Sequence, residues 1–510
     1  MPYMGIWNLY FATKLALFFG NYMGFHVLAN LAFALSLFIP IRQAHFKLLR
    51  LIVAVPIALV LFYYDTWLPP FSGLISQAAN LQQFNSSYLI ELLARFISLP
   101  MIAVLIALCM TYFLARGKIW LSPLVLLAML VPLLDMPKQS EESDQAGSQM
   151  TDEKLSASLE SFYSKEKLRS TSFAPPDKSD IPFDIIFLNI CSLSWDDLDY
   201  VKEKNNPLFK RFDIIFTNFN AAATYSGPSI IRLLRGSCGQ QKHARLYDPI
   251  NAQCQTFNNL QLVGFDPQLV LNHDGQYGNL LNDIRQRGGL QAAPFNNAGI
   301  SPYLQSFDGS PIYDDYSVLS KWWVNRLTLP APRVALYYNS ISLHDGNRYA
   351  SNPASNSREI YHPRLLKLLD NLDRFFARLS ASGRRAVVVF VPEHGAAMRG
   401  DKMQISGMRE IPSTGIGIVP VGIKLIGLTE NKATQPQIVS QASSHLAVAA
   451  LLSNFISHNP FGTKNIDWAE YVRDLPTTEY VAENEEIVVM RHRDTHYLRS
   501  KEGKWVEYAQ

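Results

Sequence analysis

The 510-residue sequence has little net charge, few cysteines and no visible internal repeat. Its formal net charge is only +3 at pH 7, so no excess of basic residues indicates binding to nucleic acid. The hydrophobic share of 48% is ordinary for a globular protein, but the apolar residues are unevenly distributed along the chain. A chain of this length has room for more than one domain, and the uneven distribution indicates where to divide it.

Charged residues are nearly absent from several apolar segments within residues 1–135. A membrane-spanning helix needs about 20 apolar residues. Three segments come close to that length: residues 49–64, 96–115 and 119–134. Residues 15–39 are also apolar, and we interpret them as two spans that begin near Leu9 and turn near Gly24, with one long tilted span as the alternative. Residues 1–135 are therefore predicted to form a multi-pass α-helical membrane domain with four or five helices, five being favoured.

Lysine and arginine are missing between Arg50 and Arg95 and are concentrated on either side of this gap. Loops rich in lysine and arginine stay in the cytoplasm. This rule places the basic loops at 41–50 and 116–118 in the cytoplasm and the loop at 65–92 outside. Everything after residue 135 is then predicted to lie outside the cytoplasm.

Residues 136–180 are polar and charged, which is typical of a linker, with room for a short amphipathic helix around 153–168. From residue 181 to 510, strand and helix signals alternate. The strand signals cover 183–190, 267–273, 332–339, 386–391 and 419–428, and the helix signals cover 228–236 and 363–383. This alternation predicts an α/β domain with a largely parallel central sheet flanked by helices. The segment "EEIVVMRHRDTHYLRSKEGKWVEYA" near the C-terminus looks like antiparallel strands at an edge.

Chemically active side chains come directly after two of the predicted strands. Cys191 follows 183–190, and Glu393 and His394 follow 386–391. Binding sites in open α/β sheets gather at the carboxyl ends of strands. A mixed set of sulfur, oxygen and nitrogen ligands suits tetrahedral Zn²⁺, and a catalytic zinc keeps one position for the reacting group. The sequence thus predicts a zinc site, although a polar loop without metal is the alternative for the Glu-His pair.

The scarcity of cysteine supports the same site. Of the four cysteines, Cys109 lies inside a predicted span and is interpreted as a packing residue. Cys238 and Cys254 are close in sequence in the external part, where disulfides persist, and could pair. Cys191 would then be an odd thiol in an oxidising compartment. A buried inert thiol is one explanation, and metal ligation is the one that also explains its position.

The segment "ATYSGPSIIRLLRGSCG" (223–239) contains a candidate nucleophile. Ser226 comes just before a helix signalled by Pro228, and serine is a good helix cap, which is one possible role. The amides at a helix N-terminus also favour an anion. A hydroxyl there that touches zinc has a lowered pKa and can act as a nucleophile. Ser226 is therefore a candidate for both roles, nucleophile and zinc ligand, with Thr224 as the rival.

Several motifs together match a known family. They include "NICSLSWDD", "TYSGPSIIRLLRGSCG", "NHDGQYG", "PEHGAAMRGDKMQISGMREIPS" and, in the membrane part, "YYDTWLP". On these motifs, nearly the whole chain resembles the alkaline-phosphatase-like phosphoethanolamine transferases, and most closely the BcsG-type cellulose phosphoethanolamine transferases of Gram-negative bacteria. The resemblance implies an alkaline-phosphatase-like fold for residues 181–510.

The resemblance also implies residue roles. It gives Ser226 as the nucleophile, Cys191, Glu393 and His394 as zinc ligands, Tyr225, His344 and Arg409 as residues of the phosphoryl pocket, and Cys238–Cys254 as a disulfide. The chain departs from the wider pattern in two places. The superfamily usually has aspartate where Cys191 stands and often threonine as the nucleophile. The family pattern "PEHGG" reads "PEHGA" here, and Ala396 could narrow the local turn.

The implied reaction is a double displacement. Phosphoethanolamine passes from phosphatidylethanolamine to Ser226, diacylglycerol leaves, and a glucose hydroxyl of nascent cellulose then takes the group. Arg409 would stabilise charge on the phosphoryl oxygens. His344 would transfer protons, or else hold its loop by a hydrogen bond.

The resemblance further implies a place in the cell and a set of partners. It puts the chain in the bacterial inner membrane with its catalytic domain in the periplasm, next to other subunits of the cellulose synthase complex. Alternatives are hydrolysis of a phosphate or sulfate ester, transfer to another envelope acceptor such as lipid A, and a non-catalytic membrane scaffold of a polysaccharide synthase.

Overall fold

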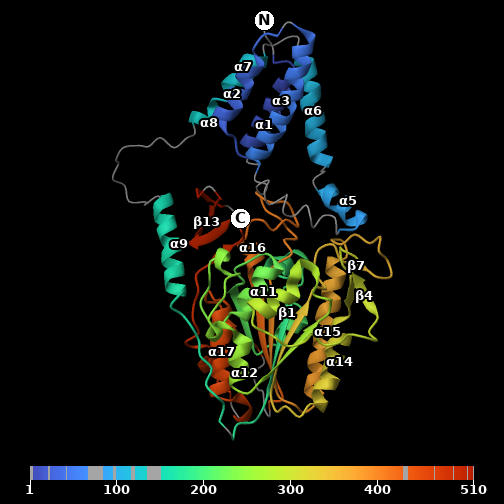
Figure 1. Ribbon diagram of the computed structural model, residues 1–510, viewed down its shortest axis with the longest axis vertical. Helices are drawn as coiled ribbons and strands as arrows, with labels where there is room; N and C mark the ends of the chain where they lie inside the picture. The colour runs from blue at the N-terminus through green and yellow to red at the C-terminus, as the bar shows by residue number, and fades with distance from the viewer. Residues whose placement is uncertain are drawn as a thin grey trace. The chain divides into compact units, whose positions relative to one another are not determined.

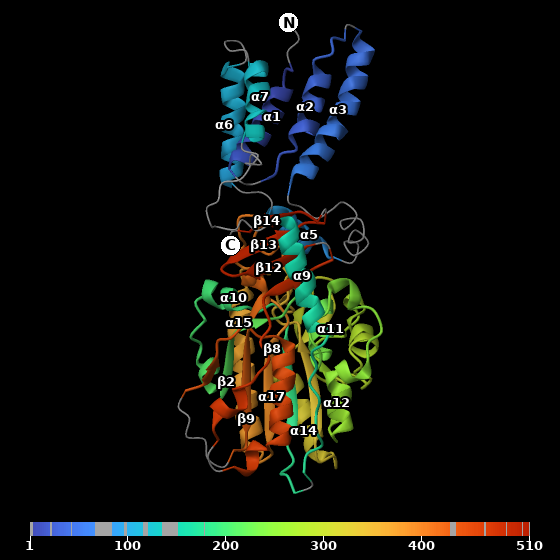
Figure 2. The ribbon, with the colours of Figure 1, turned by 90° about the vertical axis from the view of Figure 1, so that its left-hand side faces the viewer.

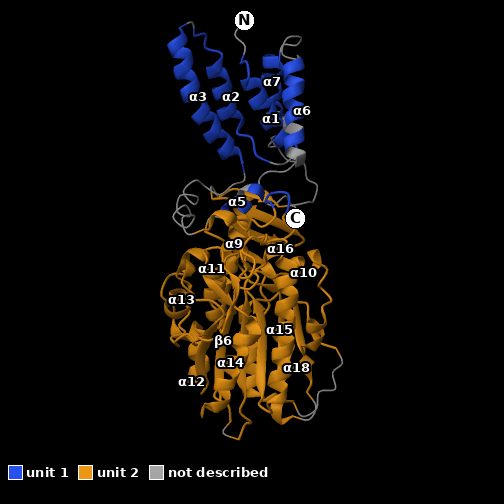
Figure 3. Cartoon of the chain, turned by 90° about the vertical axis from the view of Figure 1, so that its right-hand side faces the viewer, with its two compact units in different colours: residues 1–82, 89–149, 401–405 blue, residues 83–88, 150–400, 406–510 orange. Residues whose placement is uncertain are grey.

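The computed structural model describes most of the chain and divides it into two compact units. The described residues are 4–20, 23–41, 43–66, 84–95, 99–115, 121–134, 151–177, 179–428, 435–463, 466–485, 487–501 and 503–508. The helical unit comprises residues 1–82, 89–149 and 401–405, and the α/β unit comprises residues 83–88, 150–400 and 406–510 (Figure 3). The predicted cytoplasmic loop at 116–118 and the first part of the predicted linker, 136–150, lie outside the described residues.

The N-terminal part of the chain is helical. Its helices are α1 (Trp7–Phe19), α2 (Val27–Leu37), α3 (Ala44–Asp65), α5 (Ser86–Arg95), α6 (Leu99–Ala115), α7 (Leu121–Ala128) and α8 (Val131–Leu134). The apolar residues 15–39 thus belong to two helices, α1 and α2, and not to one long span. Among the described residues, only α3 is both long enough and apolar enough to cross a membrane by itself. The number of membrane spans therefore stays a prediction.

A buried polar cluster joins three of these helices. Lys14 of α1 forms an ion pair with Asp65 at the end of α3. Asn30 of α2 accepts a hydrogen bond from Lys14 Nζ at 2.7 Å and donates one to Asp65 Oδ2 at 2.7 Å. Charged groups are costly inside an apolar bundle unless they are paired. The pairing explains how a lysine is accommodated within the apolar helix α1.

A seven-stranded sheet forms the centre of the α/β unit (Figure 1). Its order is β10 (Gln437–Val439), β2 (Ile214–Asn220), β9 (Ile418–Ile426), β8 (Ala386–Pro392), β1 (Asp184–Ile190), β6 (Val334–Ser340) and β3 (Asp266–Leu271). Every neighbouring pair is parallel except the two pairs that involve β9. The sheet is therefore largely parallel, as the alternating sequence pattern predicts, with β9 as its one antiparallel strand.

Strands β1, β6 and β8 are buried on both faces, because helices cover each side of the sheet. Along β1, Ile185 and Phe187 belong to one apolar core, whereas Ile186 and Leu188 belong to the other. This alternation follows from the two-residue period of a strand. The first core includes residues of α11 (Ser226–Leu234), α12 (Thr256–Leu262) and α17 (His445–Ser457), the last of which lies over the sheet in Figure 2. The second includes residues of α14 (Asp315–Thr328) and α15 (Tyr361–Ala381).

The C-terminal strands form a second sheet. Its strands are β11 (Val481–Glu483), β12 (Val488–His492), β13 (Thr495–Arg499) and β14 (Trp505–Glu507). The strands are antiparallel as expected, but they form their own sheet and do not extend an edge of the central one. Helix α9 (Asp152–Glu166) packs Leu155, Leu159 and Phe162 against this sheet. For this reason the main part of the α/β unit begins near residue 150, within the predicted linker.

Several elements have no counterpart among those predicted from the sequence. They are helices α12, α14 and α17, strands β2 and β10, the three-stranded sheet of β4 (Pro302–Gln305), β5 (Pro311–Tyr313) and β7 (Arg348–Tyr349), and the short helices α10 (Trp195–Tyr200), α13 (Leu280–Asn282), α16 (Thr414–Gly417) and α18 (Trp468–Val472). Most are too short to carry a recognisable period, so the sequence alone does not reveal them.

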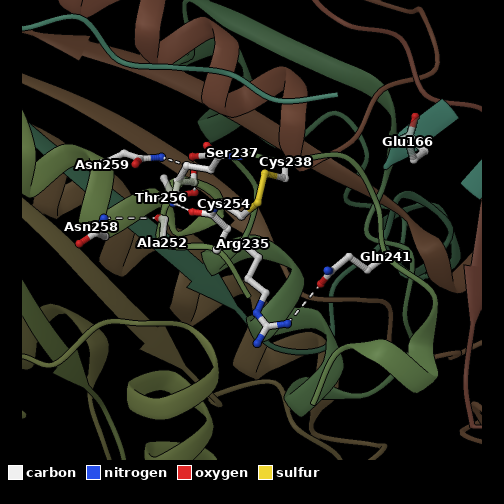
Figure 4. Close-up of a disulfide and its surroundings, with 12 residues drawn as sticks. Glu166, Arg235, Ser237, Cys238, Gln241, Ala252, Cys254, Thr256, Asn258 and Asn259 are labelled. Atoms are coloured by element: carbon white, nitrogen blue, oxygen red, sulfur yellow. Dashed lines mark hydrogen bonds between the residues drawn. A yellow bond between two sulfur atoms is a disulfide. The ribbon is translucent and has the colours of Figure 1, made fainter. Parts of the chain in front are cut away.

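Cys238 and Cys254 form a disulfide (Figure 4). The bridge links the segment after α11 to the turn before α12, and nearby Ser237 and Thr256 lie within hydrogen-bond distance at 3.2 Å. A loop of 16 residues closed in this way stabilises the fold by about 3 kcal/mol in the chain-entropy model. Cys191 is a free, buried thiol.

Candidate metal and nucleophile site

Two neighbouring parallel strands bring the predicted metal ligands together. Ile190 at the end of β1 is paired in register with Pro392 at the end of β8. The residues that follow, Cys191 on one strand and Glu393 with His394 on the other, therefore emerge side by side. Their ligand atoms lie within 4.8 Å of one another, and all three side chains are buried. The structure thus assembles the trio that strand-end positions predicted.

Hydrogen bonds orient two of these ligands toward a common point. His394 Nδ1 donates to the Gly395 carbonyl at 2.8 Å, which leaves Nε2 free to face Cys191 Sγ at 3.9 Å and Glu393 Oε2 at 3.8 Å. Glu393 Oε1 accepts a hydrogen bond from Asn339 at 2.5 Å. Glu393 Oε2 is buried and has no hydrogen-bond partner of good geometry among the described residues, although the nearby Ser226 hydroxyl and Cys191 thiol act to lower the pKa of this carboxylate against the effect of burial. A buried oxygen without a partner calls for an explanation, and a metal ion provides one.

The electrostatic environment also fits a bound cation. Burial raises the pKa of the Cys191 thiol to about 12, and the Glu393 carboxylate adds to this effect. Burial raises the pKa of Glu393 as well. Burial and the charge of Arg409 lower the pKa of His394, which keeps its imidazole neutral. A thiolate and a carboxylate are thus unfavourable here by themselves, and a divalent cation would compensate both charges. The donor set therefore fits Zn²⁺.

Ser226 lies at the start of helix α11, beside this trio. It is the first helical residue, so the helix starts two residues earlier than the sequence predicted. Tyr225 occupies the N-cap position, and no side chain caps the helix. Ser226 is therefore not a capping residue. Its Oγ lies 3.4 Å from Cys191 Sγ, and its side chain is half-buried.

Thr224, the rival nucleophile, is engaged elsewhere. Its hydroxyl donates to the Arg409 carbonyl at 2.6 Å and lies 2.9 Å from Asn484 Oδ1. The next residue, Tyr225, donates its phenolic hydroxyl to Glu410 Oε1 at 2.6 Å. Thr224 and Tyr225 thus anchor the loop that contains Arg409. Of the three residues 224–226, Ser226 faces the candidate metal ligands.

Replacing Thr224 by alanine should loosen the Arg409 loop and slow the transfer only indirectly. We expect a loss of stability of about 1 kcal/mol, because one hydrogen bond is lost while Asn484 Nδ2 still donates to the Arg409 carbonyl at 3.0 Å. Transfer should fall by roughly tenfold, about 1.4 kcal/mol of barrier, through a looser Arg409. Thermal unfolding and a transfer assay measure the two effects. Thr224→Ser keeps the hydroxyl and should behave like the unaltered chain. A loss as large as that of Ser226→Ala would contradict this assignment.

Arg409 and His344 lie near the trio, and both act electrostatically on His394. Arg409 Nη1 lies 3.3 Å from His394 Nδ1 and 3.5 Å from Ser192 Oγ, and its guanidinium lies over the Tyr225 ring at 5.4 Å. Burial, followed by the charge of Arg409, lowers the pKa of His344 to about 4. The Arg409 charge thus acts on both histidines, and the predicted residues occupy one region of the α/β unit.

His344 has a structural contact and an uncommitted nitrogen. Its Nδ1 donates to the Asp345 carbonyl at 2.7 Å, which is the loop-holding bond considered in the sequence analysis. Its ring packs against Phe307 with centroids 5.1 Å apart. No described residue hydrogen-bonds Nε2. The loop contact and a role in proton transfer are therefore compatible, because they use different nitrogens.

The replacement of glycine by Ala396 does not distort the turn. Ala396 has ordinary backbone angles, and its N–H donates to Asp197 Oδ2 at 2.7 Å. The residue with positive φ is Ala397, at 56°. Gly395 is the position that needs glycine, because a Cβ there would lie 2.7 Å from Ser194 Oγ. The departure from the family pattern thus falls where a side chain is tolerated.

The polar residues behind the candidate metal ligands are not among those predicted from the sequence. Asn189 and Asn339 lie inside buried strands, and His273 follows strand β3. All three are buried, and Asn339 contacts both Glu393 and Asn189. The available signal was an asparagine near the end of an apolar strand, in "FLNI" and "YYNS". A buried amide needs partners, so its presence there indicates a hydrogen-bonded network.

Solved structures with a similar arrangement of elements come from several bacteria. An alkaline phosphatase superfamily protein from Vibrio parahaemolyticus covers 69% of this chain and 87% of its own, with 15% identity and a TM-score of 0.47. The C-terminal periplasmic domain of EptC from Escherichia coli, in complex with Zn, covers 61% and 94%, with 14% identity and a TM-score of 0.42. The integral membrane lipooligosaccharide phosphoethanolamine transferase A from Neisseria meningitidis covers 75% and 80%, with 13% identity and a TM-score of 0.41.

Closer relatives are found by sequence. The cellulose biosynthesis protein BcsG of Salmonella typhimurium is 37% identical over 548 aligned positions, which cover 99% of this chain and 96% of the relative. BcsG of Escherichia coli K12 is 37% identical over 546 positions with the same coverage. The family model for the BcsG N-terminal domain matches residues 7–134, and that for the BcsG C-terminal domain matches residues 139–505. The chain therefore belongs to the BcsG family of cellulose biosynthesis proteins.

Proposed function

We propose that this protein is a zinc-dependent phosphoethanolamine transferase that moves phosphoethanolamine from phosphatidylethanolamine to glucose hydroxyls of nascent cellulose. The observation that carries the proposal is the position of Ser226. Its hydroxyl lies at a helix N-terminus and 3.4 Å from the Cys191 thiol of a buried, metal-compatible trio. Membership of a family of cellulose biosynthesis proteins supports the polymer as acceptor.

Cys191, Glu393 and His394 would hold the Zn²⁺, which as a Lewis acid lowers the pKa of a hydroxyl that it contacts. Other groups of the chain would stabilise the negative charge that develops during transfer. The amides of the first turn of α11 favour negative charge near Ser226. The Arg409 guanidinium, which lies over the Tyr225 ring, would stabilise charge on the phosphoryl oxygens.

The reaction proceeds in two balanced displacements. In the first, Ser226 Oγ forms a bond to phosphorus while the bond from phosphorus to the diacylglycerol oxygen breaks. In the second, a sugar hydroxyl forms a bond to phosphorus and Ser226 is released. Each step moves one proton from the attacking hydroxyl to the departing oxygen. His344 would carry it through Nε2, because its Nδ1 is engaged by the Asp345 carbonyl.

We further propose that the helical unit spans the bacterial inner membrane several times and that the α/β unit lies in the periplasm. The donor is a membrane lipid, and the acceptor emerges from a membrane-bound synthase, so a tethered enzyme meets both. Other subunits of the cellulose synthase complex are the expected partners. The alternatives are another envelope acceptor such as lipid A and a non-catalytic scaffold of a polysaccharide synthase.

Analysis of secreted cellulose tests the function directly. Cells that make cellulose and carry the intact chain should yield polymer with phosphoethanolamine on glucose, detectable by mass spectrometry of released oligosaccharides. Cells that lack the chain, or carry Ser226→Ala, should yield unmodified polymer. Lipid A is analysed from the same cultures. Modified lipid A with unmodified cellulose would select the alternative acceptor, and equal cellulose modification in all three strains would refute the proposal.

A further inference from the structure

A chain of hydrogen bonds runs from strand β3 to one of the metal-ligand candidates. The Gly275 N–H donates to His273 Nδ1 at 3.1 Å. His273 Nε2 lies 2.9 Å from Asn339 Oδ1, and Asn339 Nδ2 donates to Glu393 Oε1 at 2.5 Å. His273, Asn339 and Glu393 are all buried. This series of hydrogen bonds joins the segment after β3, strand β6 and the segment after β8, and it passes β1, which lies between β6 and β8 in the sheet.

The first hydrogen bond, from the Gly275 N–H to His273, fixes which group donates in each of the hydrogen bonds that follow. A backbone N–H can only donate, so His273 Nδ1 must accept and Nε2 must carry the proton of the neutral ring. The imidazole therefore donates to Asn339 Oδ1. The Asn339 amide then has its Nδ2 facing Glu393. Burial lowers the pKa of His273, which agrees with a neutral ring.

A second set of contacts holds Asn339 in the same orientation. Its Nδ2 also donates to Asn189 Oδ1 at 3.0 Å. Asn189 Oδ1 accepts from the Tyr337 hydroxyl at 2.7 Å, and Asn189 Nδ2 donates to the Val391 carbonyl at 2.9 Å. A flip of the Asn339 amide would place its nitrogen against the donor His273 and its oxygen against two acceptors. The amide is therefore fixed from both ends.

We propose that His273 and Asn339 are positioning residues that make Glu393 a metal ligand through Oε2 alone. Oε1 is occupied by the Asn339 amide, while Oε2 is the buried oxygen that lies 3.8 Å from His394 Nε2 and has no hydrogen bond of good geometry from any described residue. The proposal rests on the zinc site of the proposed function and deepens it.

The hydrogen-bond relay from His273 through Asn339 to Glu393 also has an electrostatic consequence. Both members are neutral, so they orient the carboxylate without neutralising it, unlike an arginine or lysine at the same place. The full negative charge stays available to the metal. Partners that orient a metal ligand in this way typically change metal affinity by 10- to 100-fold when they are removed. We expect effects of that size for Asn339 and a smaller effect for His273, which acts through Asn339.

The test uses the full chain and measures metal affinity, not turnover. The variants are Asn339→Leu, His273→Leu, His273→Gln and the double variant His273→Leu/Asn339→Leu. Competition with a zinc chelator gives the dissociation constant, and absorption of the Co²⁺-substituted protein reports the ligand geometry. Asn339→Leu should weaken zinc binding by roughly 10- to 100-fold and shift the Co²⁺ spectrum. His273→Gln, which retains a side-chain N–H donor, should bind zinc more tightly than His273→Leu.

The double variant distinguishes a relay from two separate contributions. If His273 acts only through Asn339, the double variant should bind zinc as Asn339→Leu does, because removing the second member adds nothing. Additive losses would overturn the relay. His445→Leu removes another buried imidazole, in α17, and controls for general destabilisation. If the relay variants lower the melting temperature as this control does but keep the zinc affinity and the Co²⁺ spectrum, the proposal is wrong.

These outcomes separate the relay from the proposed function. If the unaltered chain binds zinc but transfers no phosphoethanolamine, the function fails while the affinity series still decides on the relay. If the unaltered chain binds no zinc, both fail.

Discussion

The Ser226→Ala variant should transfer phosphoethanolamine at least roughly a thousandfold more slowly than the unaltered chain, and its metal content should be unchanged. This rate loss corresponds to about 4 kcal/mol of barrier. The substitution removes the attacking oxygen and leaves Cys191, Glu393 and His394 in place. It also leaves the helix intact, because no side chain caps α11 and alanine is a good helix former. A transfer assay and metal analysis of the same preparation measure the two quantities.

A trapping experiment identifies the attacking residue independently of rates. Incubation of the intact chain with phosphatidylethanolamine and no acceptor should leave phosphoethanolamine on Ser226, detected by peptide mass spectrometry. Thr224 should carry none, because its hydroxyl is engaged by the Arg409 carbonyl at 2.6 Å. Undiminished transfer by Ser226→Ala, or an adduct on Thr224, would refute the assignment of the nucleophile.

The second large effect concerns the metal. The intact chain should contain about one tightly bound zinc, and Cys191→Ala, Glu393→Ala or His394→Ala should lower its occupancy and abolish transfer. Each substitution removes one of three donors that lie within 4.8 Å of one another. Metal analysis after dialysis against a mild chelator gives the occupancy. Full zinc content in all three variants would falsify the ligand assignment.

Zinc binding should also depend on pH in a defined direction. The pKa of the Cys191 thiol is raised to about 12 and that of Glu393 is raised, so both groups hold their protons more tightly than usual before metal binds. Zinc must displace those protons, so its affinity should fall as the pH is lowered. His394, whose pKa is lowered, remains neutral over the same range and adds little to this dependence. Chelator competition at several pH values measures how zinc affinity changes with pH. The Arg409→Gln variant should change this pH dependence, because Arg409 lies beside His394 and its charge acts on Cys191.

The parts of the α/β unit that the sequence predicts are those with a strong local signal. Runs such as "AVVVFV" are apolar because a parallel sheet is covered on both faces, and helix α15 has apolar residues at helical spacing. Residues at the carboxyl ends of neighbouring parallel strands must meet at one edge of the sheet. Cys191, Glu393 and His394 could therefore be grouped from their positions at strand ends, whereas the strand order that makes β1 and β8 neighbours comes from the structure.

Other features depend on contacts between residues that are far apart in the chain. Thr224 and the carbonyl that it contacts are 185 positions apart. Helix α9 packs on strands that follow it by more than 300 positions, as the contact between Ser156 and Trp505 shows, at a separation of 349. Local propensity says nothing about such pairs, because many partners would satisfy the same hydroxyl or apolar face.

For this protein, the sequence by itself determined the strand and helix periods, the apolar character of the first part and the chemical identity of the candidate ligands. These are properties of a residue and its near neighbours. Only the tertiary structure decided which oxygen of Glu393 remains without a hydrogen bond of good geometry, that Thr224 is engaged and Ser226 faces the Cys191 thiol, and that His273 reaches Glu393 through Asn339. Those outcomes depend on strand order and register, since a shift of one residue turns each side chain to the opposite face of the sheet.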